Sequence, residues 1–148
     1  MPPATESFAA FVGGFVAAEG NFRVVGEPPK FVFAVALGAS DSGTCEALKV
    51  FFGAGTLHRR ARRRLHYDDE ISFQVRALRD LVEVTVPFMD EHLPPSHKRD
   101  QYQRWRQKLV PYWEEKARRR RPCSIDGCDA PSRGFGLCRH HYFLAYRR

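Results

Sequence analysis

Cysteine and histidine residues near the end of the sequence have a spacing that suits a metal ion. Four residues separate Cys123 from Cys128, nine separate Cys128 from Cys138, and two separate Cys138 from His141. Three thiolates and one imidazole form a ligand set that binds Zn²⁺ tetrahedrally in structural sites. A segment of this length buries too little surface to fold unaided, so a bound metal would supply the missing stability. The sequence therefore predicts a structural Zn²⁺ site.

Two alternatives to this ligand set remain open. A disulfide would leave one of the three cysteines unpaired, and a reducing compartment disfavours it. His140 precedes His141 and could replace it as a ligand, although the Cys-x2-His spacing favours His141. The fourth cysteine, Cys45, lies in a predicted helix, where we expect a small packed side chain.

Glu19 is the second residue whose position suggests chemistry. It ends the apolar stretch from Phe8 to Ala18, which reads as a helix with Ser7 as its N-cap. The free carbonyls of the last helical turn disfavour a carboxylate at that position. A bound cation would remove this conflict, and a solvated carboxylate at a frayed helix end is the alternative.

Small residues recur every fourth position along this helix. Ala9, Gly13 and Ala17 form one row, and Ala10, Gly14 and Ala18 form a second row beside it. Two glycines in a helix cost about 2 kcal/mol relative to alanine. We therefore expect the backbone of another helix to pack closely on this strip, as small-residue strips allow in membranes.

The other predicted elements alternate between hairpins and helices. Two runs rich in Val and Phe flank a turn at Gly26 to Pro29, and a second hairpin covers 55–76 with its turn between Ala61 and Asp69. Helices are predicted at 40–53, at 79–93 with a break near Pro87, and at 96–121. This order predicts an α+β domain with helices on one face of a single antiparallel sheet. We assign residues 1–117 to this domain and residues 118–148 to the zinc-binding module.

The net charge of +7 is concentrated in two places. Residues 118–148 hold eight arginines and two aspartates, and the stretch from Arg59 to Arg64 holds five arginines. A polyanion is the natural partner of such clusters. Nucleic acid is favoured over a membrane surface because no basic amphipathic helix accompanies them. A solvated arginine-rich loop is the alternative.

The apolar run from Phe8 to Ala18 does not predict a membrane segment. It is too short to span a bilayer, and Glu6 rather than a basic flank precedes it. We therefore expect neither membrane insertion nor a secretory signal. We expect the protein to be cytoplasmic.

The stretch VGGFVAAEG, from Val12 to Gly20, resembles the LAGLIDADG motif of homing endonucleases, in the variant that ends in Glu-Gly followed by a polar residue and Phe. The similarity in content and spacing continues through 50–57, 71–83 and 86–102, so it covers about residues 7–110. The resemblance implies an αββαββα fold whose sheet binds double-stranded DNA. It also implies a site-specific endonuclease that uses a divalent metal, Mg²⁺ or Mn²⁺.

Family members with one motif per chain are homodimers whose motif helices pack together. Here the resemblance assigns that interface to Ala9, Ala10, Gly13, Gly14 and Ala17. It makes Glu19 the catalytic metal ligand that positions water, with Gly20 at the same metal site. Lys98 matches a basic residue that in the family lies near the scissile phosphate.

The arginines of the strands and the second hairpin are the candidates for DNA contacts: Arg23, Arg59, Arg60, Arg62, Arg63, Arg64 and Arg76. The sequence departs from the family at Ala17, the motif's earlier acidic position, and at Ala36 to Gly38, where many family enzymes carry a polar residue near the active site. A DNA-binding protein without cleavage, or an RNA-binding or splicing-assisting module, are therefore alternatives.

The final run GLCRHHYFLAYRR resembles zinc-binding tails of phage and bacterial DNA-processing proteins. This resemblance implies a bacterial, phage or mobile-element origin. The arginines around the predicted zinc ligands favour contact with a DNA backbone. A role in protein interaction is the alternative.

Overall fold

The computed structural model describes residues 3–62 and 64–147, so the predicted DNA contact Arg63 lies outside the described residues. The chain forms two compact units, Met1–Leu109 and Val110–Arg148. The predicted division at residue 117 stays a prediction. None of the described helices combines the length and apolar content needed to cross a membrane.

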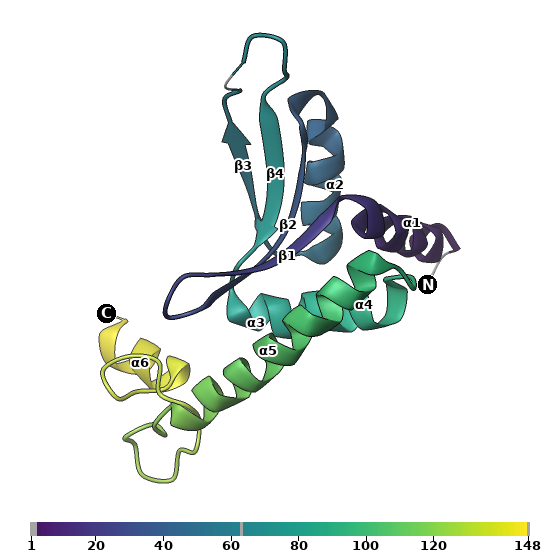
Figure 1. The fold of residues 1–148 in the computed structure, drawn as a ribbon. Helices are drawn as coiled ribbons and strands as arrows, with labels where there is room; N and C mark the ends of the chain where they lie inside the picture. The colour runs from purple at the N-terminus through teal and green to yellow at the C-terminus, as the bar shows by residue number, and fades with distance from the viewer. Residues whose placement is uncertain (1–2, 63, 148) are drawn as a thin grey trace. The chain divides into compact units, whose positions relative to one another are not determined.

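The first unit contains one antiparallel sheet with strand order β1-β2-β4-β3 (Figure 1). Its strands are β1 (Gly20–Val25), β2 (Lys30–Gly38), β3 (Thr56–Arg60) and β4 (Glu70–Val75). Its helical elements are α1 (Pro3–Glu19), η1 (Ala39–Asp41), α2 (Ser42–Phe52), α3 (Leu78–Asp80), η2 (Leu81–Thr85), α4 (Val86–His92) and the start of α5 (His97–Arg119). The predicted α+β class and element order are confirmed.

Aromatic side chains fill the space between the sheet and the helices. Phe33 and Phe73 are fully buried, with ring centroids 6.2 Å apart, and Phe52 of α2 stacks 5.7 Å from Phe73. Phe22 of β1 lies 5.2 Å from the ring of Trp105 on α5. The strands therefore place their apolar residues on the helix-covered face, which leaves the opposite face open.

Two predicted helix boundaries are wrong. α1 begins at Pro3 rather than after Ser7, because proline suits a first helical position at which no intrahelical N–H bond is required. The helical backbone also continues through the predicted break at Pro87. The turn η2 is a π-helix, and Pro87 follows it in the first turn of α4, where the missing N–H of proline is tolerated.

Hydrogen bonds fix the first turns of α5 to the rest of the unit. Ser96 caps the helix by accepting a bond from the N–H of Arg99 at 3.1 Å. Trp105 Nε1 donates to the carbonyl of Arg23 on β1 at 3.2 Å. The Tyr102 hydroxyl lies 2.7 Å from Asp90 Oδ1 on α4, and burial together with this contact raises the pKa of Tyr102. Lys98 lies in this first turn of α5, so the same hydrogen bonds position its backbone relative to the sheet.

The second unit holds the end of α5, a series of turns and α6 (Arg139–Tyr146). Two short bridges, Pro122 with Pro131 and Gly134 with Leu137, join its turns. Among its described residues, the buried apolar side chains are those of Cys123 and Cys138. This unit therefore has cysteines where a larger domain would have an aliphatic core.

Candidate functional site

A hollow of about 510 Å³ lies on the open face of the sheet at the end of α1. It brings together five of the predicted site residues, namely Glu19, Gly20, Arg23, Arg60 and Lys98. These residues come from α1, two strands of the sheet and α5. Side chains that are distant in the sequence thus meet where the motif helix joins the sheet.

The strand register explains why the hollow has a polar floor. Asn21 of β1 lies opposite Ala34 of β2, which lies opposite Gln74 of β4. Directly opposed residues of neighbouring strands share a face of the sheet. Ser72 and Glu70 therefore lie on the same face as Gln74, and all three line the hollow.

Sequence reasoning missed these polar residues of β4, although a signal for them existed. In the stretch Glu70 to Val75, the polar residues alternate with Ile71, Phe73 and Val75. Those three apolar side chains are at most 2% exposed. Strict alternation predicts a strand with one buried and one open face, so it would have placed the polar set on the open face.

Ala36, the residue at which the sequence departs from the family, also lines the hollow. Its neighbour across the sheet is Ser72, whose hydroxyl accepts a hydrogen bond from Gln74 Nε2 at 3.0 Å. Gln74 in turn accepts a bond from Arg76 Nε at 2.9 Å. The hydrogen-bonded side chains of Ser72, Gln74 and Arg76 therefore supply polar groups beside the apolar Ala36.

Glu19 reaches the hollow because α1 passes into β1 without a connecting loop. Gly20 makes this possible, since a Cβ at that position would lie 2.6 Å from the carbonyl oxygen of Val16. The Glu19 carboxylate is exposed and lines the same hollow as the Lys98 side chain. The carboxylates of Glu19 and Glu70 and the ammonium group of Lys98 therefore share this surface.

The donors at Glu19 suit a hard divalent cation but form only part of a site. Mg²⁺ binds oxygen ligands, commonly one or two carboxylates together with water and substrate phosphates. The described residues contain no group of three or more Cys, His, Asp or Glu side chains around Glu19 that could hold a metal. Further oxygen ligands would come from the backbone, from water, from substrate phosphates or from a second chain.

The two rows of small residues on α1 have different surroundings. Gly13 is buried against α4, because a Cβ there would lie 2.2 Å from the carbonyl oxygen of His92, and Ala9 in the same row is 7% exposed. At Gly14 nothing lies within 4 Å of such a Cβ, and Ala10 is also exposed. Within one chain, Ala9 and Gly13 are therefore buried while Ala10 and Gly14 are open, and the predicted dimer interface stays a prediction. Neighbouring residues point about 100° apart around a helix, so the two rows meet different partners.

The predicted DNA-contacting arginines do not share one face of the sheet. Arg60 lies opposite Glu70 and lines the hollow. Arg59 lies opposite the buried Ile71, which places it on the helix-covered face of the sheet. Arg62 and Arg64 belong to the loop between β3 and β4. The strand alternation thus separates residues that the sequence groups as one cluster.

Acidic residues of the loop between β3 and β4 accept hydrogen bonds from within the loop and from η1. Asp69 Oδ1 accepts a bond from the N–H of Arg62 at 3.1 Å, and Asp68 Oδ2 accepts one from the N–H of Ser40 at 2.9 Å. The hydrogen bonds from Ser40 lower the pKa of Asp68. Arg60, Arg62 and Arg64 line a second hollow of about 460 Å³ at this loop.

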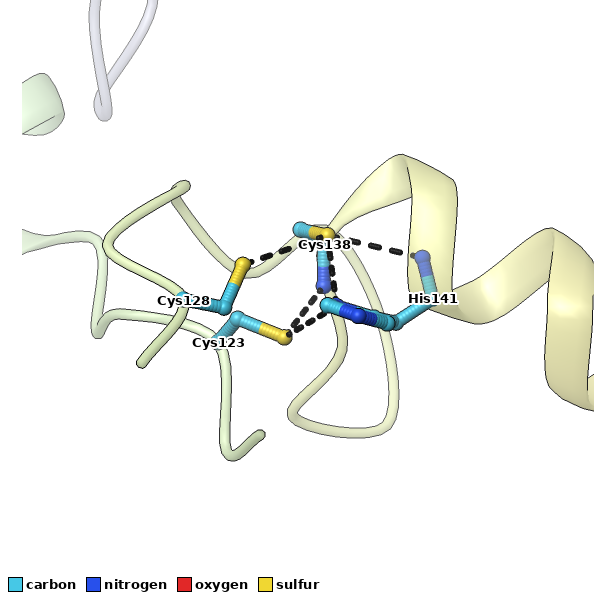
Figure 2. Close-up of side chains that lie close together, drawn as sticks. All are labelled: Cys123, Cys128, Cys138 and His141. Carbon is cyan, nitrogen blue, oxygen red and sulfur yellow. Dashed lines mark hydrogen bonds between the residues drawn. The ribbon is translucent and has the colours of Figure 1, made fainter. Parts of the chain in front are cut away.

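The predicted zinc ligands converge in the second unit, as Figure 2 shows. The ligand atoms of Cys123, Cys128, Cys138 and His141 all lie within 4.8 Å of one another. Cys128 Sγ lies 3.9 Å from Cys138 Sγ, and His141 Nδ1 lies 3.3 Å from the sulfurs of Cys123 and Cys138.

The 3.9 Å and 3.3 Å separations are close to those of a tetrahedral zinc site. With Zn–S of about 2.3 Å and Zn–N of about 2.0 Å, two sulfurs are about 3.8 Å apart and sulfur and nitrogen about 3.5 Å apart. A disulfide would need sulfurs about 2.05 Å apart, and the cysteines are free. His140 is exposed, and the imidazole of the cluster is that of His141.

The protonation of the thiols also favours a bound cation. Burial raises the pKa of Cys123, but hydrogen bonds from the N–H of Cys138, from Ile125 and from His141 outweigh it and bring the pKa to about 6. A backbone bond from Ala130 lowers the pKa of Cys128, yet burial and the neighbouring Cys138 and Cys123 leave it raised. The neighbouring sulfurs therefore favour the thiolate of Cys123 but oppose ionisation of Cys128, and a bound metal ion would relieve that opposition.

No protein-family model and no curated protein matches the sequence. Among solved structures, I-SmaMI bound to uncleaved DNA with calcium ions matches with a TM-score of 0.63 at 23% identity, over 73% of this chain and 38% of that chain. The LAGLIDADG meganuclease I-CpaMI bound to uncleaved DNA matches with a TM-score of 0.61 at 20% identity, over 73% of this chain and 37% of that chain.

The homing endonuclease I-TnaI matches with a TM-score of 0.63 at 23% identity, over 73% of this chain and 75% of that chain. The matched part of this chain thus spans less than two fifths of I-SmaMI and I-CpaMI. The first unit has the LAGLIDADG fold, as the motif predicts.

Proposed function

We propose that this protein is a site-specific endonuclease that hydrolyses phosphodiester bonds of double-stranded DNA as a homodimer, with a divalent metal at Glu19. The observation that carries the proposal is the hollow that joins Glu19 and Lys98 to the polar, arginine-bearing face of the sheet. Such a reaction needs cationic groups for the DNA backbone, a ligand for a divalent cation and a polar surface for base edges. The arginines, Glu19 and the polar side chains of this face support the proposal.

The open face supplies two kinds of DNA contact. Arg23 and Arg60 carry guanidinium groups that pair with phosphate oxygens or with guanine edges. Asn21, His58 and Gln74 line the same hollow and offer donors and acceptors to bases in the major groove. I-SmaMI and I-CpaMI, which share the fold, are both bound to DNA, and this supports the assignment.

At the reacting phosphate the chain contributes a carboxylate and a cation. Glu19 would hold Mg²⁺ or Mn²⁺ together with the backbone carbonyl of Gly20, and its second oxygen would orient the attacking water. The divalent ion supplies Lewis-acid activation of the scissile phosphate. Lys98, which lines the same hollow, would stabilise the negative charge that develops on the phosphate oxygens.

A homodimer is proposed because one chain offers one Glu19. Cleavage of both strands needs two such sites, and a two-fold dimer provides them from one sequence. The exposed row of Ala10 and Gly14 on α1, beside Phe11 at 52% exposure, offers an apolar surface for a second copy. The chain also corresponds to less than half of I-SmaMI but to three quarters of I-TnaI.

The experiment is cleavage of a DNA library that contains the native insertion locus, with Mg²⁺ or Mn²⁺, by the wild-type protein and by Glu19→Gln. We expect metal-dependent cleavage by the wild type alone, with DNA binding retained by both. Binding without cleavage would favour the alternative of a DNA-binding regulator, which the apolar Ala36 in the hollow supports. Preference for RNA in competition binding would contradict both assignments.

We also propose that Cys123, Cys128, Cys138 and His141 bind a structural Zn²⁺ ion. The support is the mutual distance of the ligand atoms and the lack of any other buried apolar side chain among the described residues of the second unit. Metal analysis of the purified protein should give one zinc per chain. A protein that is folded throughout this unit without metal would contradict the assignment.

A further inference from the structure

The second unit exposes a cluster of aromatic side chains. Phe135 is 80% exposed, Tyr142 36% and Tyr146 59%. Their rings contact one another, with centroid distances of 6.2 Å between Phe135 and Tyr142, 5.6 Å between Phe135 and Tyr146, and 5.0 Å between Tyr142 and Tyr146. An exposed apolar cluster of this kind marks a binding surface more often than a solvated one.

The backbone at Phe135 is in a conformation that a bulky residue rarely adopts. Its φ is +51°, and Gly136 follows with a φ of +74°. The N–H of Leu137 closes the tight turn by donating to the carbonyl of Gly134 at 2.9 Å. Glycine or asparagine would fit this turn with less strain. The exposed ring of Phe135 is not buried within the chain, so burial does not offset this backbone strain. Contact with a binding partner would explain why phenylalanine stands at this position.

Arginines surround the aromatic cluster. Arg133 and Arg139 line a hollow of about 310 Å³ together with Phe135 and Tyr142. Arg139 also lines an adjoining hollow of about 600 Å³ with Arg147, and its guanidinium lies 5.9 Å from the centroid of the Phe143 ring. The described residues that line these two hollows include no acidic side chain.

We propose that this aromatic-arginine face, formed by Arg133, Phe135, Arg139, Tyr142 and Arg147, binds the sugar–phosphate backbone of duplex DNA. It would do so in addition to the contacts made by the sheet. Guanidinium groups pair with phosphate oxygens, and the rings between them offer apolar surface to the sugars. The inference rests on the proposed DNA binding of the sheet and on the proposed zinc ion that holds the turns of this unit.

The charge of this face and its covalent connection to the first unit favour DNA over another polyanion. The first unit is proposed to bind the same duplex, so a second contact on the same chain acts at a high effective concentration. Two hollows without acidic residues suit a partner that carries a regular row of negative charges. An acidic protein partner would be an outcome of the test rather than a second proposal.

The test measures the affinity of the full chain for a long duplex as a function of salt concentration. We expect the pair Arg133→Gln and Arg139→Gln to weaken binding roughly tenfold and to lower the salt slope by about 2, because each phosphate contact contributes about 0.9. The control pair Lys49→Gln and Arg79→Gln removes the same charge from α2 and α3 and should leave the slope unchanged.

A single substitution separates folding from binding. Phe135→Gly removes the ring and relieves the positive φ, so we expect unchanged zinc content with weaker duplex binding. Zinc content is measured for every variant. A variant pair at Arg133 and Arg139 that retains zinc and keeps the wild-type affinity and slope would overturn the inference. So would a loss confined to single-stranded DNA.

DNA binding by the sheet is tested with separate variants. The pair Arg23→Gln and Arg60→Gln should lower the slope by a similar amount and add to the effect of the module variants. An unchanged slope for this pair would overturn the proposed function of the sheet and leave the aromatic-arginine face supported by its own variants.

Discussion

Glu19 and Lys98 line the same hollow, Glu19 from the last residue of α1 and Lys98 from the first turn of α5. Gly20 turns the chain from α1 into β1 directly after Glu19, and Ser96 starts α5 two residues before Lys98. The Cβ that Gly20 lacks would collide with the carbonyl of Val16, so the turn depends on glycine. The end of α1 therefore positions Glu19, the start of α5 positions Lys98, and both side chains line the hollow.

Removal of the Glu19 charge should abolish cleavage without unfolding the protein. Glu19→Gln keeps the size of the side chain but removes the anion that would hold the metal. We expect the cleavage rate to fall by about 10²–10³ or more, with DNA affinity within a few-fold of the wild type. Single-turnover cleavage and binding assays measure the two effects. Glu46→Gln on the exposed face of α2 is the matched control.

Lys98 is expected to act on the rate rather than on binding. Lys98→Gln should lower the single-turnover rate by about 10- to 100-fold, while Lys98→Arg should recover part of it because the charge is kept. Equal losses in the Gln and Arg variants would argue against an electrostatic role for this residue. A comparable loss in Lys108→Gln, further along α5, would show that any charge removal has this effect.

The zinc ligands can be tested with adjacent histidines. His141→Ala should release zinc, because His141 Nδ1 lies 3.3 Å from the sulfurs of Cys123 and Cys138. His140→Ala should retain it, since the exposed His140 lies outside the cluster. Metal content and the visible absorption of the Co²⁺-substituted protein report the result. Zinc retention in His141→Ala would contradict the assigned ligand set.

At the scale of elements, α1 presents two different surfaces. One row of small residues packs on α4 at Gly13, and the other row, with Gly14, is open. Strand β3 shows a similar division, since Arg60 lies on the open face of the sheet and Arg59 on the helix-covered face. The secondary structure thus assigns different partners to residues that are adjacent in the chain.

Alanine substitutions at the two glycines of α1 should have opposite effects. Gly13→Ala should lower the free energy of unfolding by roughly 1–2 kcal/mol, because the methyl group would collide with the carbonyl of His92. Gly14→Ala should raise it by up to about 1 kcal/mol through helix propensity, since its Cβ meets nothing within 4 Å. Denaturant unfolding at low protein concentration measures both. Equal destabilisation by the two substitutions would contradict this division of α1.

At the scale of the whole molecule, the proposed reaction requires two chains. A single hollow contains one Glu19, and among the described residues no group of three or more metal-ligating side chains surrounds it, although Glu70 also lines the hollow. The open row on α1 lies on the helix that carries Glu19, so pairing along this row would bring two such carboxylates near each other.

Mixed dimers provide the test of this arrangement. When the wild type is mixed with an excess of Glu19→Gln, most wild-type chains would pair with an inactive partner. We expect nicked DNA to replace double-strand breaks as the variant is added, because each dimer then cuts one strand. Gly14→Leu should instead shift the protein toward monomers in sedimentation. Double-strand cleavage that is insensitive to the variant would contradict the dimer.

The sequence by itself determined the features that depend on local patterns. Periodicity and turn residues predicted the order of helices and strands, and the spacing of Cys123, Cys128, Cys138 and His141 predicted their cluster, because short loops confine such residues to one neighbourhood. The motif placed Glu19 at the end of the first helix. These predictions needed no knowledge of which elements pack together.

The tertiary structure decided the rest. Which glycine row is open depends on α4, almost eighty residues further along the chain, and the presence of Lys98 in the same hollow as Glu19 depends on how α5 packs on the sheet. The register of β3 with β4 separates Arg59 from Arg60, and the π turn before Pro87 keeps a helix that proline alone predicts to break. Contacts between distant residues set each of these outcomes, and local propensity does not encode such contacts.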